Sequence, residues 1–141
     1  MVELLIAAAA SVGVAVSMGD GHCDLQPRLL GGWEAAAANV FLCPDAIERE
    51  GADPEVVLRH ELIHVIQDRV PGPLIPEPLL TVLTRDRVPS GEALLVLVGE
   101  EDSQREFECR VLTELLSSEA VADWLERTAE PQLNEVGLQQ L

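Results

Sequence analysis

The sequence has no tyrosine and no lysine, and its aromatic residues are two tryptophans and two phenylalanines. A core must therefore be built from aliphatic side chains, and hydrophobic residues make up 48% of the 141 residues. Without tyrosine, no phenol is available to donate a hydrogen bond to a developing oxyanion. The length suits one domain with a single core and is short for two.

Basic residues are also few. Nine arginines stand against 25 acidic residues, and the formal net charge is −16. A field of that sign repels nucleic acid and anionic lipid, so neither is expected as a partner. Polypeptides and cations are the partners that such a chain favours.

No apolar run is long enough to span a bilayer, since the longest stretch covers only residues 4–16. It follows Glu3 instead of a positively charged start, and no clean A-x-A cleavage pattern comes after it. Over a targeting segment we therefore prefer a first helix at about residues 2–11 and a strand at about residues 12–17.

Cysteine is scarce, with Cys23, Cys43 and Cys109 widely spaced and no CxxC pair. This spacing fits neither a zinc ribbon nor a disulfide framework. A Cys23–Cys43 bridge is one alternative, but buried thiols in a reducing compartment are the simpler interpretation. The expected location is cytoplasmic.

Turn and cap signals predict a single α+β domain over residues 1–141. Glycines mark turns at MGDGHCD and RLLGG, and NVFLCP from Asn39 is expected to be a strand. Asp53 is a good N-cap and Pro54 suits the first helical position. We expect an N-terminal helix and strands within residues 1–45, followed by three helices over residues 53–70, 101–117 and 118–130. One or two short helices are expected between residues 70 and 101, and a loosely ordered tail after Pro131.

The central motif is HELIH, within VVLRHELIHVIQDRV. His60 and His64 are four residues apart and share one helix face, so both can reach a cation at about 2.0–2.1 Å from each nitrogen. Glu61 lies beside them, in the place of a general base. The surrounding helix is apolar around most of its circumference, and burying these groups unpaired would cost several kcal/mol. We interpret the motif as a zinc site; the alternative is two core histidines bonded to carbonyls or to Glu61.

A catalytic zinc needs a third protein ligand. Asp68 is better placed to orient an imidazole, whereas REFECRVLTELL in the later helix resembles the ligand-bearing helix of glutamate zincins. Together with HELIH and the preceding FLCP, the chain resembles minimal gluzincin-type metallopeptidases. It is similar to mitochondrial inner-membrane processing proteases of ATP-synthase assembly and to their small bacterial and phage relatives. The resemblance covers about residues 39–116.

The resemblance implies that Glu106 is the third ligand, with Cys109 where alanine is usual. Helical periodicity favours Glu108 instead, because it lies near the centre of the apolar face. We choose Glu106, while Glu108 remains an alternative. In a third interpretation, both are simply part of a solvated, charged helix start.

The resemblance further implies a zincin-like fold, in which a small sheet holds an edge strand above the HExxH helix. The strand around residues 40–42 would pair there with an extended peptide. Zn²⁺ held by His60, His64 and Glu106, with Glu61 as base, would hydrolyse a peptide or protein substrate. The alternatives are a non-catalytic structural or regulatory module that retains the metal site, and hydrolysis of a non-peptide amide.

Two further segments carry candidate residues. Trp33 and Glu34 in GGWEAA either form a wall of the cleft or cap the core. In the absence of tyrosine, His22 or an arginine is the alternative oxyanion donor, but His22 lies in a glycine-rich turn and is expected at the surface.

Overall fold

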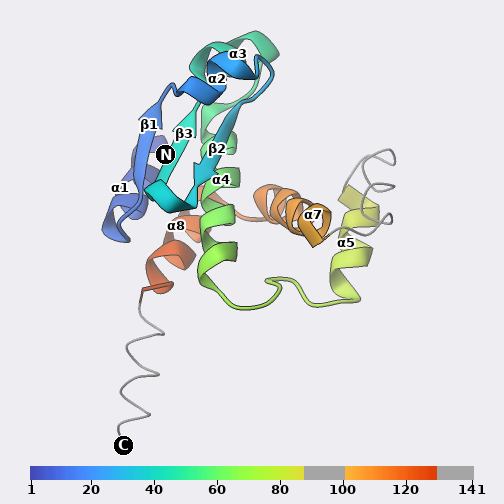
Figure 1. Cartoon of the computed structure of the whole chain (residues 1–141). Helices are drawn as coiled ribbons and strands as arrows, with labels where there is room; N and C mark the ends of the chain where they lie inside the picture. The colour runs from blue at the N-terminus through green and yellow to red at the C-terminus, as the bar shows by residue number, and fades with distance from the viewer. Residues whose placement is uncertain (88–100, 130–141) are drawn as a thin grey trace, which may run out of the picture.

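The computed structural model of the chain describes residues 1–87 and 101–129 and has an α+β architecture (Figure 1). In this part of the chain, seven α-helices accompany a three-stranded sheet. In chain order the elements are α1 (Val2–Ser11), β1 (Ala15–Met18), α2 (Gly21–Leu25), β2 (Gly31–Glu34), a 3₁₀ turn η1 (Ala35–Ala37), β3 (Asn39–Leu42), α3 (Pro44–Glu50), α4 (Pro54–Arg69), α5 (Leu79–Arg87), α7 (Glu101–Leu115) and α8 (Ser118–Arg127).

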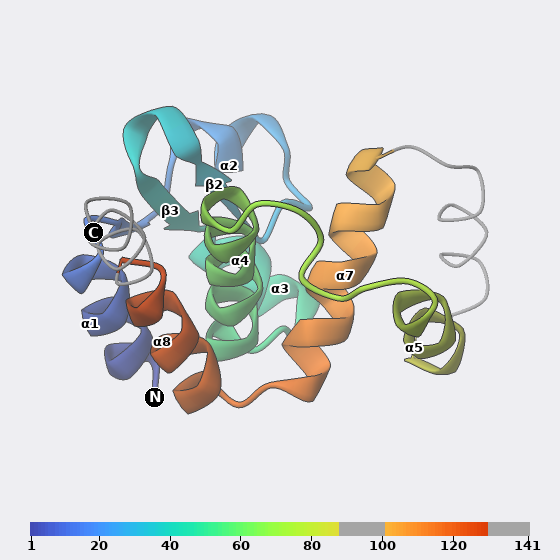
Figure 2. The ribbon, with the colours of Figure 1, turned by 90° about the horizontal axis from the view of Figure 1, so that it is seen from below.

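The helix α4 is the centre of the packing. Figure 2 shows it between α1 and α8 on one side and α7 on the other, with α5 beyond α7. Its other contacts are with β2 and β3. Because neighbours surround it, side chains around most of its circumference are fully buried: Leu58, Leu62, Ile63, Val65 and Ile66. Each contributes about 1.5–3 kcal/mol by leaving water, so α4 holds its polar residues in a rigid frame.

The helix signals predicted most of these boundaries. Asp53 caps α4, its carboxylate accepting a hydrogen bond from the Glu55 backbone N–H at 2.9 Å, and Ser117 caps α8. The predicted N-terminal helix, the strand from Asn39 and the two later helices are confirmed. The short helices α2 and α3 were not predicted. The expected tail after Pro131, and any second short helix within 88–100, lie outside the described residues.

The first strand begins later than predicted, at Ala15. The backbone N–H groups of Val12 and Gly13 donate to the carbonyls of Ala9 and Ala10, which closes α1 with an extra turn. Gly13 has a φ of +80°, a conformation that side chains disfavour. Residues 12–14 therefore form the helix end and not the start of a strand.

The sheet has the order β1-β3-β2, with β1 parallel and β2 antiparallel to β3. The expectation that residues 40–42 form an edge strand is therefore wrong, because β3 is the central strand. The edge strand beside α4 is β2, which begins at the glycine pair that we interpreted as a turn. Strand order depends on pairing between distant segments, which no local signal in GGWE reports.

The glycines of β2 are required by close packing. A Cβ on Gly31 would lie 2.7 Å from the Phe41 carbonyl oxygen and 3.2 Å from a methyl of Val57. A Cβ on Gly32 would lie 2.6 Å from the Phe41 ring. The pair thus allows β2 to approach both β3 and α4.

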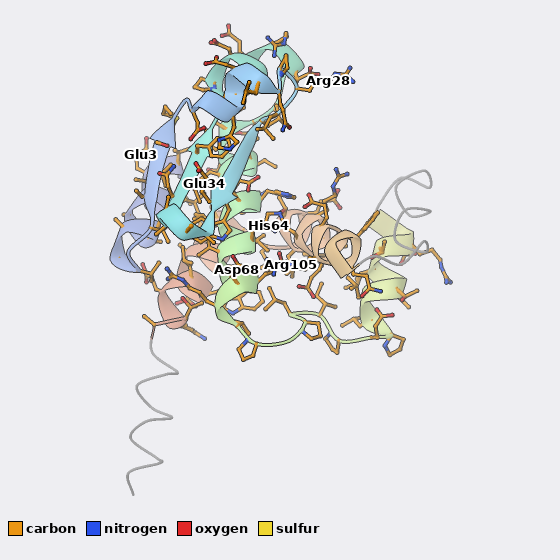
Figure 3. The ribbon with its side chains drawn as sticks, viewed as in Figure 1. Glu3, Arg28, Glu34, His64, Asp68 and Arg105 are labelled. Atoms are coloured by element: carbon orange, nitrogen blue, oxygen red, sulfur yellow. A yellow bond between two sulfur atoms is a disulfide. The ribbon has the colours of Figure 1, made fainter. Side chains whose placement is uncertain are left out.

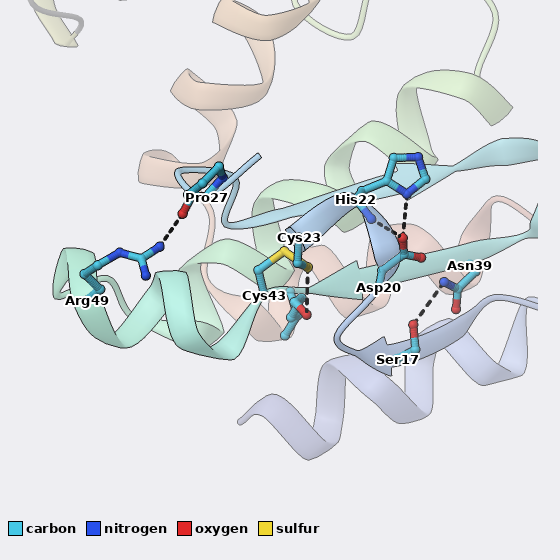
Figure 4. The surroundings of a disulfide bond; sticks show 9 residues. Ser17, Asp20, His22, Cys23, Pro27, Asn39, Cys43 and Arg49 are labelled. Atoms are coloured by element: carbon cyan, nitrogen blue, oxygen red, sulfur yellow. Dashed lines mark hydrogen bonds and ion pairs between the residues drawn. A yellow bond between two sulfur atoms is a disulfide. The ribbon is translucent and has the colours of Figure 1, made fainter. Parts of the chain in front are cut away.

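Cys23 of α2 and Cys43, directly after β3, form a disulfide with a Cα–Cα distance of 5.6 Å (Figure 4). The prediction of reduced thiols is wrong for this pair. The two cysteines are 20 residues apart in the sequence, and the fold places α2 next to the end of β3, where they meet. Cys109 is free and buried, as predicted. Disulfides are typical of oxidising compartments, so the cytoplasmic location stays a prediction that the cysteines do not support. Among the described residues, no helix combines the length and apolar character that a membrane crossing needs.

Replacing Gly31 by alanine should lower the free energy of unfolding by about 1–3 kcal/mol, because the new methyl group meets a backbone carbonyl that cannot move away. Chemical denaturation measures the change. Gly21→Ala is the matched control, since no atom lies within 4 Å of its Cβ position, and its effect should stay within about 0.5 kcal/mol. Equal stabilities of the two variants would contradict this account of β2.

Candidate metal centre

The helices α4 and α7 bring His60, His64 and Glu106 together. One oxygen of the Glu106 carboxylate lies 3.0 Å from His60 Nε2, and the other lies 3.1 Å from His64 Nε2. The two rings are 4.9 Å apart between centroids and nearly perpendicular, at 86°. A single carboxylate therefore bridges two imidazoles that stand one helical turn apart.

The opposite nitrogen of each ring faces a protein acceptor. His64 Nδ1 lies 2.8 Å from the Gln67 side-chain oxygen, which can only accept. His60 Nδ1 lies 3.4 Å from the Thr113 hydroxyl, which donates its own hydrogen to the Cys109 carbonyl at 2.7 Å and so is free to accept. Both Nδ1 atoms therefore carry hydrogen, and both Nε2 atoms are directed at Glu106.

Asp68 does not orient an imidazole, so that prediction is wrong. Its two oxygens accept hydrogen bonds at 2.6 Å from Trp33 Nε1 and from Arg105. Figure 3 shows Asp68, Arg105 and His64 close together between α4 and α7. Gln67 has the orienting role instead, because helix geometry turns the residue three positions after His64 towards its ring.

The Asp68 carboxylate joins three elements of the fold. Partial burial disfavours its charge, but the hydrogen bonds from Trp33 and Arg105 hold the pKa of Asp68 below its usual value. Trp33 also packs against the main core. Of the two predicted roles for Trp33, the structure thus shows core packing, combined with a polar link from β2 to α4.

Glu108 is buried, as its place on the apolar face predicted, with 4% of its surface exposed. It lies away from the imidazoles: its oxygens accept from Gln67 Nε2 and from the Ile75 backbone N–H, both at 2.9 Å. Glu108 and Gln67 also line a cleft of about 490 Å³, together with Arg105 and the apolar Val70 and Leu80.

The electrostatics of the cluster favour positive charge between the rings. Burial disfavours protonated imidazoles, but the Cys109 side chain and the Glu106 carboxylate outweigh it and raise the pKa of His60 to about 9 and that of His64 to about 11. Hydrogen bonds from the same two histidines hold the pKa of Glu106 far below its usual value. These shifts favour positive charge between the two rings and the Glu106 carboxylate, where a cation would also be stabilised.

The pKa of Glu61 is shifted in the opposite direction to that of Glu106. Burial raises the pKa of Glu61, although the charges of His60 and His64 act against that shift. Its side chain interacts electrostatically with both histidines and with Glu106, so it belongs to the same cluster. A carboxylate with a raised pKa next to such a centre is a suitable proton acceptor near neutral pH.

Cys109 is a potential ligand, whereas the sequence predicted only a buried thiol at a position where alanine is usual. Its sulfur lies within 4.8 Å of a ring nitrogen of each histidine. Its thiol donates to the His60 carbonyl, with 3.0 Å between sulfur and oxygen. The spacing from Glu106, three residues along α7, was the signal in the sequence that pointed to this position.

A second group lies away from α4. His22 is exposed, as predicted, and pairs with Asp20 at 2.5 Å while its ring stacks on Phe41. The potential ligand atoms of Asp20, His22 and Glu34 lie within 4.8 Å of one another. Because side chains alternate along a strand, Glu34 faces the side of the sheet opposite to Trp33, so its predicted role in the cleft wall is wrong.

Comparison with known proteins adds no relative: neither a family model, nor a curated protein, nor a solved structure matches this chain. A function can therefore be proposed only from the geometry and chemistry of the residues themselves.

In the metal-free protein, His60 and His64 should both remain protonated at neutral pH, titrating well above the ordinary value of 6.5. Glu106→Gln should lower both pKa values, because it removes the carboxylate while burial of the rings remains. Ring NMR signals followed over pH measure this change. Glu114→Gln, an exposed site on the same helix, should leave both titrations unaltered, and unshifted histidines in the Glu106 variant would disprove the coupling.

Proposed function

We propose that this chain is a zinc-dependent peptidase of a minimal gluzincin-like type, in which His60, His64 and Glu106 hold the metal and Glu61 is the general base. One observation carries the proposal. Both Nδ1 atoms are hydrogen-bonded to protein acceptors, so both Nε2 atoms are left to face one carboxylate. This is the arrangement in which histidines bind metals.

The donor set fits zinc. Two imidazoles and a carboxylate are an established set for a catalytic site, which leaves a fourth position for water. Glu106 suits the role of third ligand better than Cys109 does, because its two oxygens already bridge the Nε2 atoms. Its side chain is also 43% exposed, so the centre is open to solvent on that side.

A bound zinc ion would acidify a water molecule and polarise the carbonyl of the scissile bond. Glu61 would accept the proton of that water on a carboxylate oxygen and deliver it to the leaving amine. Its burial supports this step, since a carboxylate with a raised pKa holds a proton more readily. Gln67 and Thr113 would keep the imidazoles in the tautomer that coordinates metal.

The substrate would be a peptide or protein. The edge strand β2 contacts α4, and an extended peptide pairing with such an edge would lie alongside the metal centre. The net charge of −16 favours neutral or basic segments over acidic ones.

One observation favours a second function, a non-catalytic module that retains the metal. Cys109 would supply a fourth protein donor beside the two histidines, and sites with four protein ligands are structural. Glu61 supports the catalytic alternative, because a closed site has no use for a buried carboxylate with a raised pKa.

Zinc affinities of single variants distinguish a site with the ligands His60, His64 and Glu106 from one that also includes Cys109. The wild-type chain should bind about one zinc ion, and Glu106→Ala should weaken the affinity at least 100-fold by removing one of three ligands. Cys109→Ala should bind zinc within a few-fold of wild type. Competition with a chromophoric chelator measures each constant. A comparable loss in the Cys109 variant and in the Glu106 variant would favour the structural module, in which both residues are ligands.

Replacing Glu61 by glutamine should leave zinc affinity nearly unchanged and reduce peptide hydrolysis by about 10²–10⁴-fold, because the amide cannot accept the proton. Cleavage of unfolded casein and of quenched fluorescent peptides measures the rate. Glu55→Gln, on the same helix but outside the cluster, is the control and should keep full activity. Undiminished hydrolysis by the Glu61 variant would exclude it as the base.

A further inference from the structure

We propose that Gln67 and Glu108 are positioning residues of the metal centre, in which the buried Glu108 carboxylate fixes the Gln67 amide and this amide fixes the ring of His64. The inference rests on the proposed zinc site and goes beyond it, since neither residue would touch the metal. It gives a role to Glu108, which helical periodicity had suggested as an alternative third ligand.

The orientation of the Gln67 amide is determined by its neighbours. Its nitrogen donates to the Arg105 carbonyl at 2.8 Å and to a Glu108 oxygen at 2.9 Å. Neither of these atoms can donate, so a flipped amide would place its oxygen against two acceptors. The side chain is buried, and no orientation other than the observed one satisfies these contacts. The amide oxygen must therefore face His64.

This orientation determines the tautomer of His64. The Gln67 oxygen lies 2.8 Å from Nδ1, so Nδ1 carries a hydrogen and Nε2 is the nitrogen that would give up its proton to bind a metal. His60 has a longer contact, 3.4 Å, to the Thr113 hydroxyl. A hydroxyl can rotate and donate as well as accept, whereas the held amide cannot. His64 is thus the more rigidly prepared of the two histidines.

Glu108 is the buried end of this chain of hydrogen bonds, which runs from Glu108 through Gln67 to His64 and which we call the relay. One oxygen accepts from Gln67, and the other accepts from the Ile75 backbone N–H at 2.9 Å. Ile75 belongs to the segment that follows α4, so the same carboxylate also holds the chain beyond the metal-binding helix. A neutral amide at position 108 would place an NH₂ group among these donors and would leave the Arg105 carbonyl as the one remaining acceptor that holds the Gln67 amide.

Zinc affinity tests the relay. Gln67→Met keeps the volume of the side chain and removes both its donors and its acceptor, so zinc should bind about 10–100-fold more weakly, as for other partners of metal-bound histidines. Gln104→Met is the matched control. Gln104 is exposed and lines the same cleft, and this variant should bind zinc as wild type does.

Glu108→Gln is the second variant and should also lower zinc affinity, because the Gln67 amide then loses one of the two acceptors that keep its NH₂ group turned away from His64. Thermal unfolding of each variant shows whether it is folded. Affinities within about twofold of wild type in both folded variants would overturn the proposal.

A measurement on the wild-type chain does not depend on any variant folding. In the zinc-loaded protein, ¹⁵N and ¹H spectra should show His64 with metal on Nε2 and with an Nδ1 proton that exchanges slowly with water. Metal on Nδ1, or a rapidly exchanging proton, would overturn the relay while leaving the zinc site intact. A wild-type chain that binds no zinc would instead disprove the proposed function.

Discussion

The contact of one carboxylate with two imidazoles is the constraint on which the structure depends. Glu106 of α7 lies within 3.1 Å of both His60 and His64 of α4, so it fixes how these two helices face each other. Arg59 supports the same interface by donating to the Thr113 carbonyl. The negative charge of Glu106 offsets the cost of burying two protonated imidazoles. A metal cation bound between neutral imidazoles and Glu106 would balance the same negative charge.

The polar groups around this contact are arranged so that few conformations satisfy them. Gln67 has one orientation, and Asp68 holds both Trp33 and Arg105. Gln67 and Glu108 are buried, and a buried polar group that loses its partner costs about 1–3 kcal/mol, so each of these two side chains restrains the other. Such a network would hold the side chains of the proposed metal site in place before a metal binds.

The charges of the two carboxylates bear on the two functions proposed for this cluster. Glu61 is disfavoured as an anion by burial, whereas Glu106 is strongly favoured as an anion by the histidines. Two carboxylates with opposite shifts in one cluster are suited to different roles, one as proton acceptor and one as ligand. Cys109, one turn beyond Glu106 on α7, is the residue whose role decides whether the site is open or closed.

The sequence by itself determined the elements that depend on local interactions. Asp53 and Pro54 predicted the start of α4, the spacing of His60 and His64 placed them on one face, and the pattern around Glu108 predicted its burial. Only tertiary structure decided the rest. The strand order, the Cys23–Cys43 bridge, and the choice of Gln67 over Asp68 as partner of His64 all depend on which distant segments meet. Such meetings are set by packing and pairing across the whole fold, and no short stretch of sequence carries that information.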